Sequence, residues 1–365
     1  MSLRKRASRA LPLIAAAALL AACSPTYVIR AGYEEAKILS RRQSIQKLVD
    51  DPRTPPEERA KLALVLQARS FAQKSLHLKA GDSYTTYSRL KSDTLAMVVS
   101  AAYRDRFQAY TWWFPIVGHV PYKGFFSESD ARDEMRKLEA KGLDTYMRPT
   151  SAFSTLGWFK DPLVSPVLRY GEVDLVNTVV HEIFHNTIYV SGQAMFNESA
   201  ANFVGAHGAI EFFCRRDGAD SPACTRARAE WEDDLLFGRF LDGFVGELQT
   251  LYGRTDLSSA QKVAARDAIF QRAKQRFADE VRPALKVQSF ASFTRDPLNN
   301  ATLISRRLYY HRLDLFERVL QSRGGDLDRT IADIVRAARG SKDPYGRTEA
   351  LLGAGLGTGQ VSKSK

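Results

Sequence analysis

The stretch that decides the fold runs from Leu175 to Val204 and reads LVNTVVHEIFHNTIYVSGQAMFNESAANFV. Its first part, Leu175 to Val190, is apolar over a length that predicts a buried helix. Gly192 indicates a turn, and Phe196 to Phe213 predicts a second helix that returns along the first. We therefore expect a helical hairpin at the centre of the fold.

Two histidines lie four residues apart on the first of these helices. His181 and His185 share one helix face, about a turn apart, so both imidazoles can reach one metal ion. Glu182 is offset by one residue, which leaves its carboxylate beside the open coordination position. There it can take a proton from a water molecule whose pKa zinc lowers from about 16 to about 7. The pattern predicts a catalytic zinc site.

A catalytic zinc ion needs a third protein ligand, and Glu198 is the candidate. It lies at the start of the second helix, close to the turn, where its carboxylate can reach both histidines. Asn202 shares its face at i+4 and is a candidate to orient a ligand. His207, nine residues after Glu198, falls on the far side of the helix, and we expect it to be structural. The expected cofactor is one zinc ion on His181, His185 and Glu198.

The competing interpretation is a buried helix whose histidines bond to the backbone. Three ionisable groups buried within five residues without a partner would cost several kcal/mol, a difficulty that a metal ion removes. Because the chain has only 6 histidines, a chance His-Glu-x-x-His on an apolar helix is improbable.

The first residues predict a secretion signal. Four basic residues precede an apolar stretch from Ala10 to Ala22, which is short for a bilayer span. The stretch ends in Leu20-Ala21-Ala22-Cys23, which resembles the lipobox of bacterial lipoproteins. That resemblance implies removal of residues 1–22, lipidation of Cys23 and, from Ser24, sorting to the outer membrane. A plain signal peptide with an incidental Cys23 is the alternative.

The net charge and the cysteines do not identify a binding partner. The formal charge falls from +12 to +8 without residues 1–22, which carry four basic residues and no acids. The remaining positive charges are spread along predicted helices, so we expect a solvated surface and no nucleic-acid partner. Cys214 and Cys224 flank a turn region, and in an oxidising compartment they would form a disulfide; two free thiols are the alternative.

Capping patterns and strand propensities place the other elements. Thr54-Pro55-Pro56-Glu57 predicts a capping box at a helix start, as do Ser258 and Gln261, and Gly142 ends a predicted helix over residues 127–141. Short apolar, aromatic and β-branched runs predict strands. These runs cover residues 94–103, 112–122, 145–147 and 152–159.

Four parts of the sequence resemble the Putative aminopeptidase family, bacterial zinc peptidases that are often lipoproteins. They are WFPIVG at 113–118 with PYKGFF at 121–126, STLGWF at 154–159 with DPL at 161–163, the quoted stretch from His181, and LNNA at 298–301 with Tyr310-His311. The resemblance covers most of the chain after residue 22. It implies a gluzincin-like site in which His181, His185 and Glu198 hold zinc and Glu182 is the general base.

The resemblance also suggests roles for other residues. In zincins an edge strand pairs with the extended substrate, and residues 152–159 are the candidate. Tyr310 or His311 is a candidate donor to the oxyanion, with packing in the core as the alternative. Asp161 and Glu211 are candidates to bind the substrate's ammonium group.

These observations combine into one expectation. The fold is α+β and mostly helical, with a zincin-like core that holds a small mixed sheet at residues 93–216. Helical regions flank it at 23–92 and 217–340, and residues 341–365 form a flexible tail. The expected protein is a zinc metallopeptidase, by resemblance an aminopeptidase, that acts on peptides and is anchored in the cell envelope facing the periplasm.

Two other functions remain as alternatives. The first is an envelope endopeptidase or a hydrolase of peptidoglycan peptides, which differs in substrate length. The second is a non-catalytic zinc-binding lipoprotein scaffold. Glu182 argues against the scaffold, because a structural zinc site needs no base.

Overall fold

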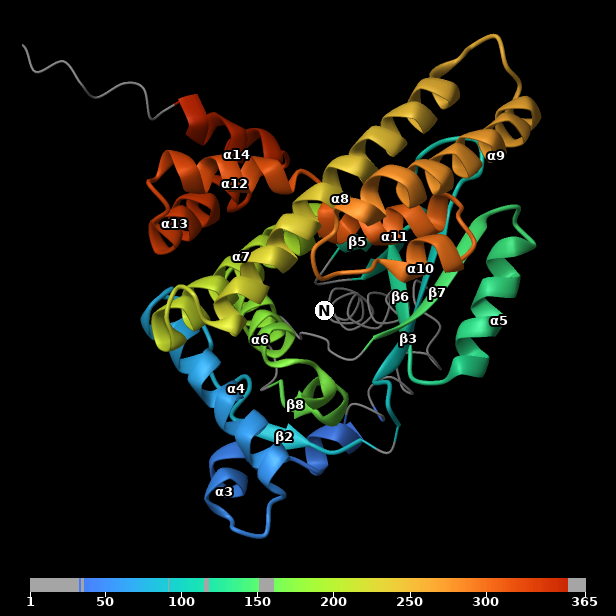
Figure 1. Ribbon diagram of the computed structural model, residues 1–365. Helices are drawn as coiled ribbons and strands as arrows, with labels where there is room; N and C mark the ends of the chain where they lie inside the picture. The colour runs from blue at the N-terminus through green and yellow to red at the C-terminus, as the bar shows by residue number, and fades with distance from the viewer. Residues whose placement is uncertain (1–32, 34–35, 91, 115–117, 151–160, 354–365) are drawn as a thin grey trace, which may run out of the picture.

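Helices dominate the computed structural model, which describes residues 33, 36–90, 92–114, 118–150 and 161–353 (Figure 1). The predicted lipidation site Cys23 and the predicted edge strand at 152–159 lie outside this range. The described strands form three small sheets, so the α+β class is confirmed. Within the described part of the chain, no helix combines the length and apolarity needed to cross a bilayer.

The N-terminal part packs helices beside a small sheet. Its elements are β1 (Gln43–Ser44), α3 (Ile45–Asp50), α4 (Pro56–Lys74) and β2 (Thr86–Ser88). The sheet has the order β1-β2-β8, where β8 (Leu163–Val164) runs parallel to β2.

The predicted capping box at α4 is wrong. The helix begins one residue later than expected, so its N-cap is Pro55 and no side chain caps it. Thr54 therefore lies outside the first turn, where its hydroxyl cannot reach the free N–H groups. The capping box of Ser258 and Gln261 is confirmed, with both of its hydrogen bonds present.

A second sheet comes from the aromatic stretch. It has the order β6-β3-β7, formed by β6 (Tyr122–Phe125), β3 (Ala96–Ala102) and β7 (Asp144–Thr150). Both pairings are antiparallel, so this sheet is not mixed as predicted. Among the described strands, the parallel pair is β2 with β8. The hairpin of β4 (Trp112–Phe114) and β5 (Gly118–Val120) and the helix α5 (Glu128–Glu139) complete this region, with α5 packed on the sheet.

The rest of the described chain is helical. After a 3-10 turn at Ser165–Arg169 come α6 (Glu172–Thr187), α7 (Ala194–Asp217), α8 (Pro222–Gly253), α9 (Ser259–Arg276), a π turn at Phe277–Val281, a 3-10 turn at Arg282–Ala284, α10 (Ala291–Arg295), α11 (Asn300–Tyr310), α12 (Leu313–Ser322), α13 (Leu327–Ala338) and α14 (Pro344–Gly353). Cys214 at the end of α7 and Cys224 at the start of α8 form the expected disulfide.

Helix α14 corrects the prediction of a flexible tail for residues 341–365. Its aromatic residue Tyr345 packs against Phe196 of α7, with ring centroids 5.2 Å apart, and against Phe316 of α12. This burial outweighs the Gly- and Ser-rich composition on which the prediction rested. Residues 354–365 lie outside the described range.

One large core surrounds α6. The side chains of Val176, Val179, Val180 and Ile183 are fully buried, and they join a cluster that extends from α4 through α7 to α13. The N-terminal, central and C-terminal regions thus share a hydrophobic core. A helix buried in this way can hold polar side chains only where they find partners.

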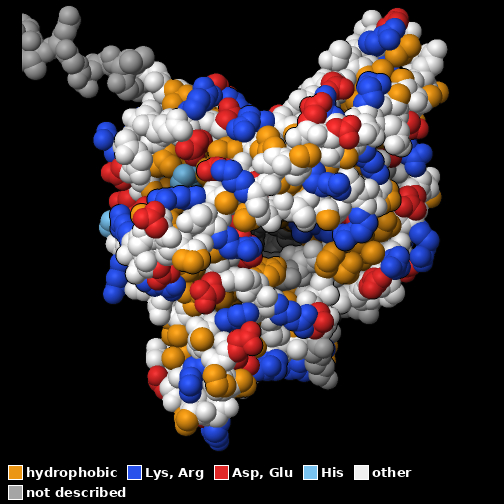
Figure 2. Space-filling view, viewed as in Figure 1, with side chains coloured by type: hydrophobic (Ala, Val, Ile, Leu, Met, Phe, Trp, Pro, Cys, Tyr) orange, Lys and Arg blue, Asp and Glu red, His pale blue; other side chains and the backbone are white. Residues whose placement is uncertain are grey.

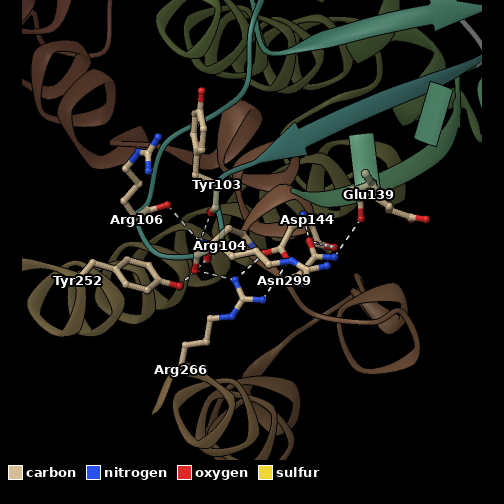
Figure 3. Close-up of polar contacts among 11 residues, drawn as sticks. Tyr103, Arg104, Arg106, Glu139, Asp144, Tyr252, Arg266 and Asn299 are labelled. Carbon is tan, nitrogen blue, oxygen red and sulfur yellow. Dashed lines mark hydrogen bonds and ion pairs between the residues drawn. The ribbon is translucent and has the colours of Figure 1, made fainter. Parts of the chain in front are cut away.

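A buried polar cluster fixes the start of β7 to the C-terminal helices (Figure 3). Arg266 of α9 donates two hydrogen bonds to the carboxylate of Asp144, at 2.6 and 2.9 Å. The backbone N–H of Asn300 donates to the same carboxylate at 3.0 Å, and the hydroxyl of Tyr252 donates to the Asn300 side chain. The cluster therefore sets how α11 lies against β7.

Candidate metal centre

The predicted helical hairpin is present, and its turn is held by specific contacts. Gly192 has a φ of +74°, a left-handed conformation that favours glycine. The side chain of Asn197 bridges the loop, because it accepts a hydrogen bond from the Val190 N–H and donates one to the Val190 carbonyl, both at 2.9 Å. These bonds fix where α7 begins, and hence where Glu198 lies.

The two helices approach each other almost backbone to backbone. A Cβ atom on Gly205 would lie 2.3 Å from the Asn177 side-chain oxygen and 2.8 Å from the Asn177 carbonyl oxygen. One on Gly208 would lie 2.8 Å from Cγ1 of Val180. The glycines on α7 thus permit a spacing that larger residues would prevent, and this spacing brings Glu198 to the histidines.

The three predicted ligands converge on one point. The Nε2 atoms of His181 and His185 are 3.2 Å apart, and Oε2 of Glu198 lies 3.6 Å from the first and 3.8 Å from the second. Ligand atoms about 2.0–2.1 Å from a tetrahedral zinc ion are about 3.3 Å apart. The triad therefore fits one ion after a contraction of a few tenths of an ångström. It is the one such group of three in the described ranges.

The pKa values of His185 and Glu198 suit a cation, whereas the pKa of His181 is raised. Burial lowers the pKa of His181, but its contact with Glu198 and the charge of Glu182 outweigh this effect. Burial lowers the pKa of His185 to about 4, which keeps its imidazole neutral. Burial alone would raise the pKa of Glu198, but its hydrogen bond with His181 and its electrostatic interactions with the two imidazoles lower it to about 2. A neutral imidazole and an ionised carboxylate are the forms that bind metal.

Glu182 lies beside the triad in a cavity of about 620 Å³ that His181 also lines. Figure 2 shows the molecule hollowed at the centre of the face where α6, α11 and β7 meet in Figure 1. Burial raises the pKa of Glu182 to about 7, and the charges of Glu198 and Asp161 add to the rise. A carboxylate with a pKa near neutral can both accept and return a proton.

Three residues of this site, Tyr122, Arg148 and Tyr309, have no role predicted from the sequence. The hydroxyl of Tyr122 donates to Oε1 of Glu198 at 3.5 Å, at the long limit for a hydrogen bond. The ring of Tyr309 lies 6.2 Å from that of His181, and its hydroxyl accepts a hydrogen bond from Arg148 at 3.0 Å. Tyr122 lies in a stretch that carries the family resemblance, but no spacing marked it.

Comparison with known proteins places the chain in a family. The family model described as Putative aminopeptidase matches residues 26–351. The chain belongs to the Putative aminopeptidase family. The match includes every helix and strand that forms the site, from β6 to α11. Neither a search of curated proteins nor a search of solved structures finds a significant match.

In this member of the Putative aminopeptidase family, the tyrosine beside His181 is Tyr309 and not the predicted candidate Tyr310. Tyr310 borders the cavity, but its ring packs against Phe237 at a centroid distance of 5.1 Å. Successive helical residues point about 100° apart, so only one of the two tyrosines can face His181. The other candidate, His311, contacts Asp242 instead, at 2.9 Å.

The amide of Asn202 also has other partners than predicted. It donates to the backbone carbonyl of Tyr309 at 3.1 Å and to the carboxylate of Asp234 at 3.4 Å. The reason is that α8 and α11 pack on this side of α7, beyond Glu198. Asn202 thus holds α11 in place and lines the cavity, while the hydroxyl of Tyr122 donates to the predicted ligand Glu198.

Of the remaining predicted residues, His207 and Glu211 have partners away from the cavity, whereas Asp161 lies near Glu182. His207 lies 2.8 Å from Glu317 and against Trp231, as expected for a structural residue. Glu211 pairs with Arg215 at 2.6 Å and is absent from the described lining of the cavity. Asp161 is buried and acts on Glu182, so it is the better placed of the two candidate acids.

Proposed function

We propose that this protein is a zinc-dependent aminopeptidase with a zincin-like core. The observation that carries the proposal is the convergence of His181, His185 and Glu198, with Glu182 in the adjoining cavity. Membership of the Putative aminopeptidase family supports peptidase activity. A structural zinc site would need neither the cavity nor the base.

Each group has a defined task in peptide hydrolysis. When bound by the triad, zinc supplies an electrophile that acidifies water and polarises a carbonyl group. Glu182 accepts the proton of the attacking water and returns it to the departing amine. Tyr122 holds Glu198 in the orientation that faces the histidines.

Tyr309 is proposed to stabilise the oxyanion. Burial, together with the charge of Glu198, raises the pKa of Tyr309 to about 12, so the hydroxyl stays protonated. Since Arg148 donates to its oxygen, the hydroxyl proton remains free for another acceptor. A donor aimed at the developing charge contributes about 3 kcal/mol in comparable sites.

The free amine of the substrate requires an acid near the scissile bond. Asp174 lines the cavity with Glu182, and Asp161 lies close enough to raise the pKa of Glu182, after the larger effect of burial. We propose that these acids select substrates with an ammonium group. The lipobox-like segment supports a lipid anchor at Cys23 in the outer membrane, facing the periplasm.

Zinc content and substrate length test the proposal together. The mature protein is expected to bind one zinc ion, which Glu198→Ala should lose and the matched variant His207→Ala should keep. Peptides with a free amine should be cut one residue at a time, and their N-acetylated forms should resist. Efficient cleavage of N-acetylated peptides would favour the endopeptidase, and zinc binding without any cleavage would favour the scaffold.

A further inference from the structure

Arg148 has no role in holding the triad, yet it lines the same cavity as His181 and Glu182. It lies on β7, opposite Val98 of β3, and it is the one positively charged residue among the described residues around the cavity. Its guanidinium donates to the hydroxyl of Tyr309, whose ring lies 6.2 Å from that of His181, so the charge lies near the triad. The position therefore gives the cavity a fixed positive charge.

Arg148 is half-buried, and its guanidinium lacks a carboxylate partner among the described residues. It donates one hydrogen bond, to the hydroxyl of Tyr309, and stacks over that ring at 5.6 Å. No carboxylate among the described residues forms an ion pair with it. By contrast, the buried Arg266 is paired with both oxygens of Asp144 (Figure 3). A charge that is partly withdrawn from water and has no counter-ion is unfavourable, so its position in the cavity indicates that a ligand of opposite charge completes it.

The chemistry of that ligand follows from the shape of the group. A guanidinium presents five N–H donors in a planar fork, and Tyr309 uses one of them. The fork matches a carboxylate, which it can bind through two parallel hydrogen bonds. Glu198 cannot be that carboxylate in the working enzyme, because the proposed metal uses it.

We propose that Arg148 binds a carboxylate of the substrate next to the scissile bond, an inference that rests on the proposed function. An aminopeptidase releases one residue, so when that residue is neutral, as alanine is, the nearest carboxylate of the substrate lies on the residue that follows the cleaved bond. That carboxylate is either the chain end of a dipeptide or an acidic side chain. The site therefore selects very short or acidic peptides.

Three substrates separate these sources: alanyl-alanine, its C-terminal amide, and the amide of alanyl-glutamate. For the wild-type protein we expect kcat/KM about 10- to 100-fold higher for a substrate with a carboxylate than for alanyl-alanine amide. A preference for the dipeptide alone assigns the chain end, and a preference for the glutamyl amide alone assigns the side chain. Equal values for all three would overturn the inference and leave the proposed function intact.

Variants then assign the preference to Arg148. Arg148→Gln should bring the ratio between carboxylate and amide substrates close to one, while Arg148→Lys should retain part of it. Tyr309→Phe is the matched control, because it should lower all three rates by the same factor. If Arg148→Gln also lowers all three equally, Arg148 only positions Tyr309 and the inference fails. The ratio is measured within one sample, so partial unfolding does not disturb it.

A binding measurement keeps the two proposals distinguishable. Calorimetric titration of alanyl-alanine and its amide into zinc-loaded Glu182→Gln needs no turnover. If Glu182→Gln binds the dipeptide more tightly than the amide, and the double variant Glu182→Gln/Arg148→Gln does not, the carboxylate site is supported even if no peptide is hydrolysed. Equal binding of dipeptide and amide contradicts it.

Discussion

Replacing Gly205 by alanine tests the helix spacing on which the metal centre depends. The added Cβ atom would lie 2.8 Å from the backbone oxygen of Asn177, and this contact cannot be relieved by turning a side chain. An ordinary contact needs about 3.4 Å, so α6 and α7 must separate by about 0.6 Å. Overpacking of this kind costs about 1–3 kcal/mol, and the better helix propensity of alanine returns about 0.5–1 kcal/mol.

The expected result is a net loss in the free energy of unfolding of about 1 kcal/mol, within the range of about 0–2.5 kcal/mol that these two terms leave, measured by urea denaturation of the metal-free protein. The matched control is Gly243→Ala on α8, where nothing lies within 4 Å of the added atom. That variant should gain about 0.5–1 kcal/mol.

The same shift should weaken the metal site. Ligand distances in zinc sites tolerate about 0.2 Å, so moving Glu198 by about 0.6 Å should reduce zinc affinity about 10- to 100-fold. Competition with a chromogenic chelator measures this affinity. If Gly205→Ala gains stability as Gly243→Ala does and binds zinc as tightly as the wild type, the reasoning about helix spacing is refuted.

Three further predictions concern the surroundings of the triad. Tyr122→Phe should weaken zinc binding about tenfold, because it removes the donor to Glu198; unchanged chelator competition would contradict this. Tyr309→Phe should lower kcat about 100-fold with little change in KM, whereas Tyr310→Phe should change kcat less than about threefold. Equal effects on kcat would remove the distinction between the two tyrosines. Burial raises the pKa of Asp234 from 3.8 to about 7, so the folded protein holds a proton that the unfolded chain has released. The free energy of unfolding should therefore fall as the pH rises from about 4 to 7, and Asp234→Asn should flatten this fall. Urea denaturation at pH 5 and pH 8 measures the change in the free energy of unfolding between these pH values. The same change in the wild type and in Asp234→Asn would exclude Asp234 as its source.

Local spacing explains which parts of the site could be predicted. His181, Glu182 and His185 are fixed relative to one another by one helical turn, and a turn residue, Gly192, sufficed to bring Glu198 near them. The structure bears out this hairpin. The same kind of local reasoning failed at α14, where burial of an aromatic side chain outweighs composition.

The rest of the site depends on contacts between distant segments. Tyr122 and Glu198 are 76 residues apart, and Arg148 and Tyr309 are 161 residues apart. No local pattern encodes such pairs, because the packing of β6, β7 and α11 decides them. The choice of Tyr310 over Tyr309 shows the limit, since one residue along a helix turns a side chain by about 100°.

The most direct test of the central claim is a comparison of the wild-type protein with Glu182→Gln. Zinc content by mass spectrometry and hydrolysis of a free dipeptide are measured on the same samples. The account predicts one zinc ion in both proteins and a loss of at least about 1,000-fold in kcat for the variant. Wild-type activity in zinc-loaded Glu182→Gln would contradict the role of this glutamate and with it the proposed reaction.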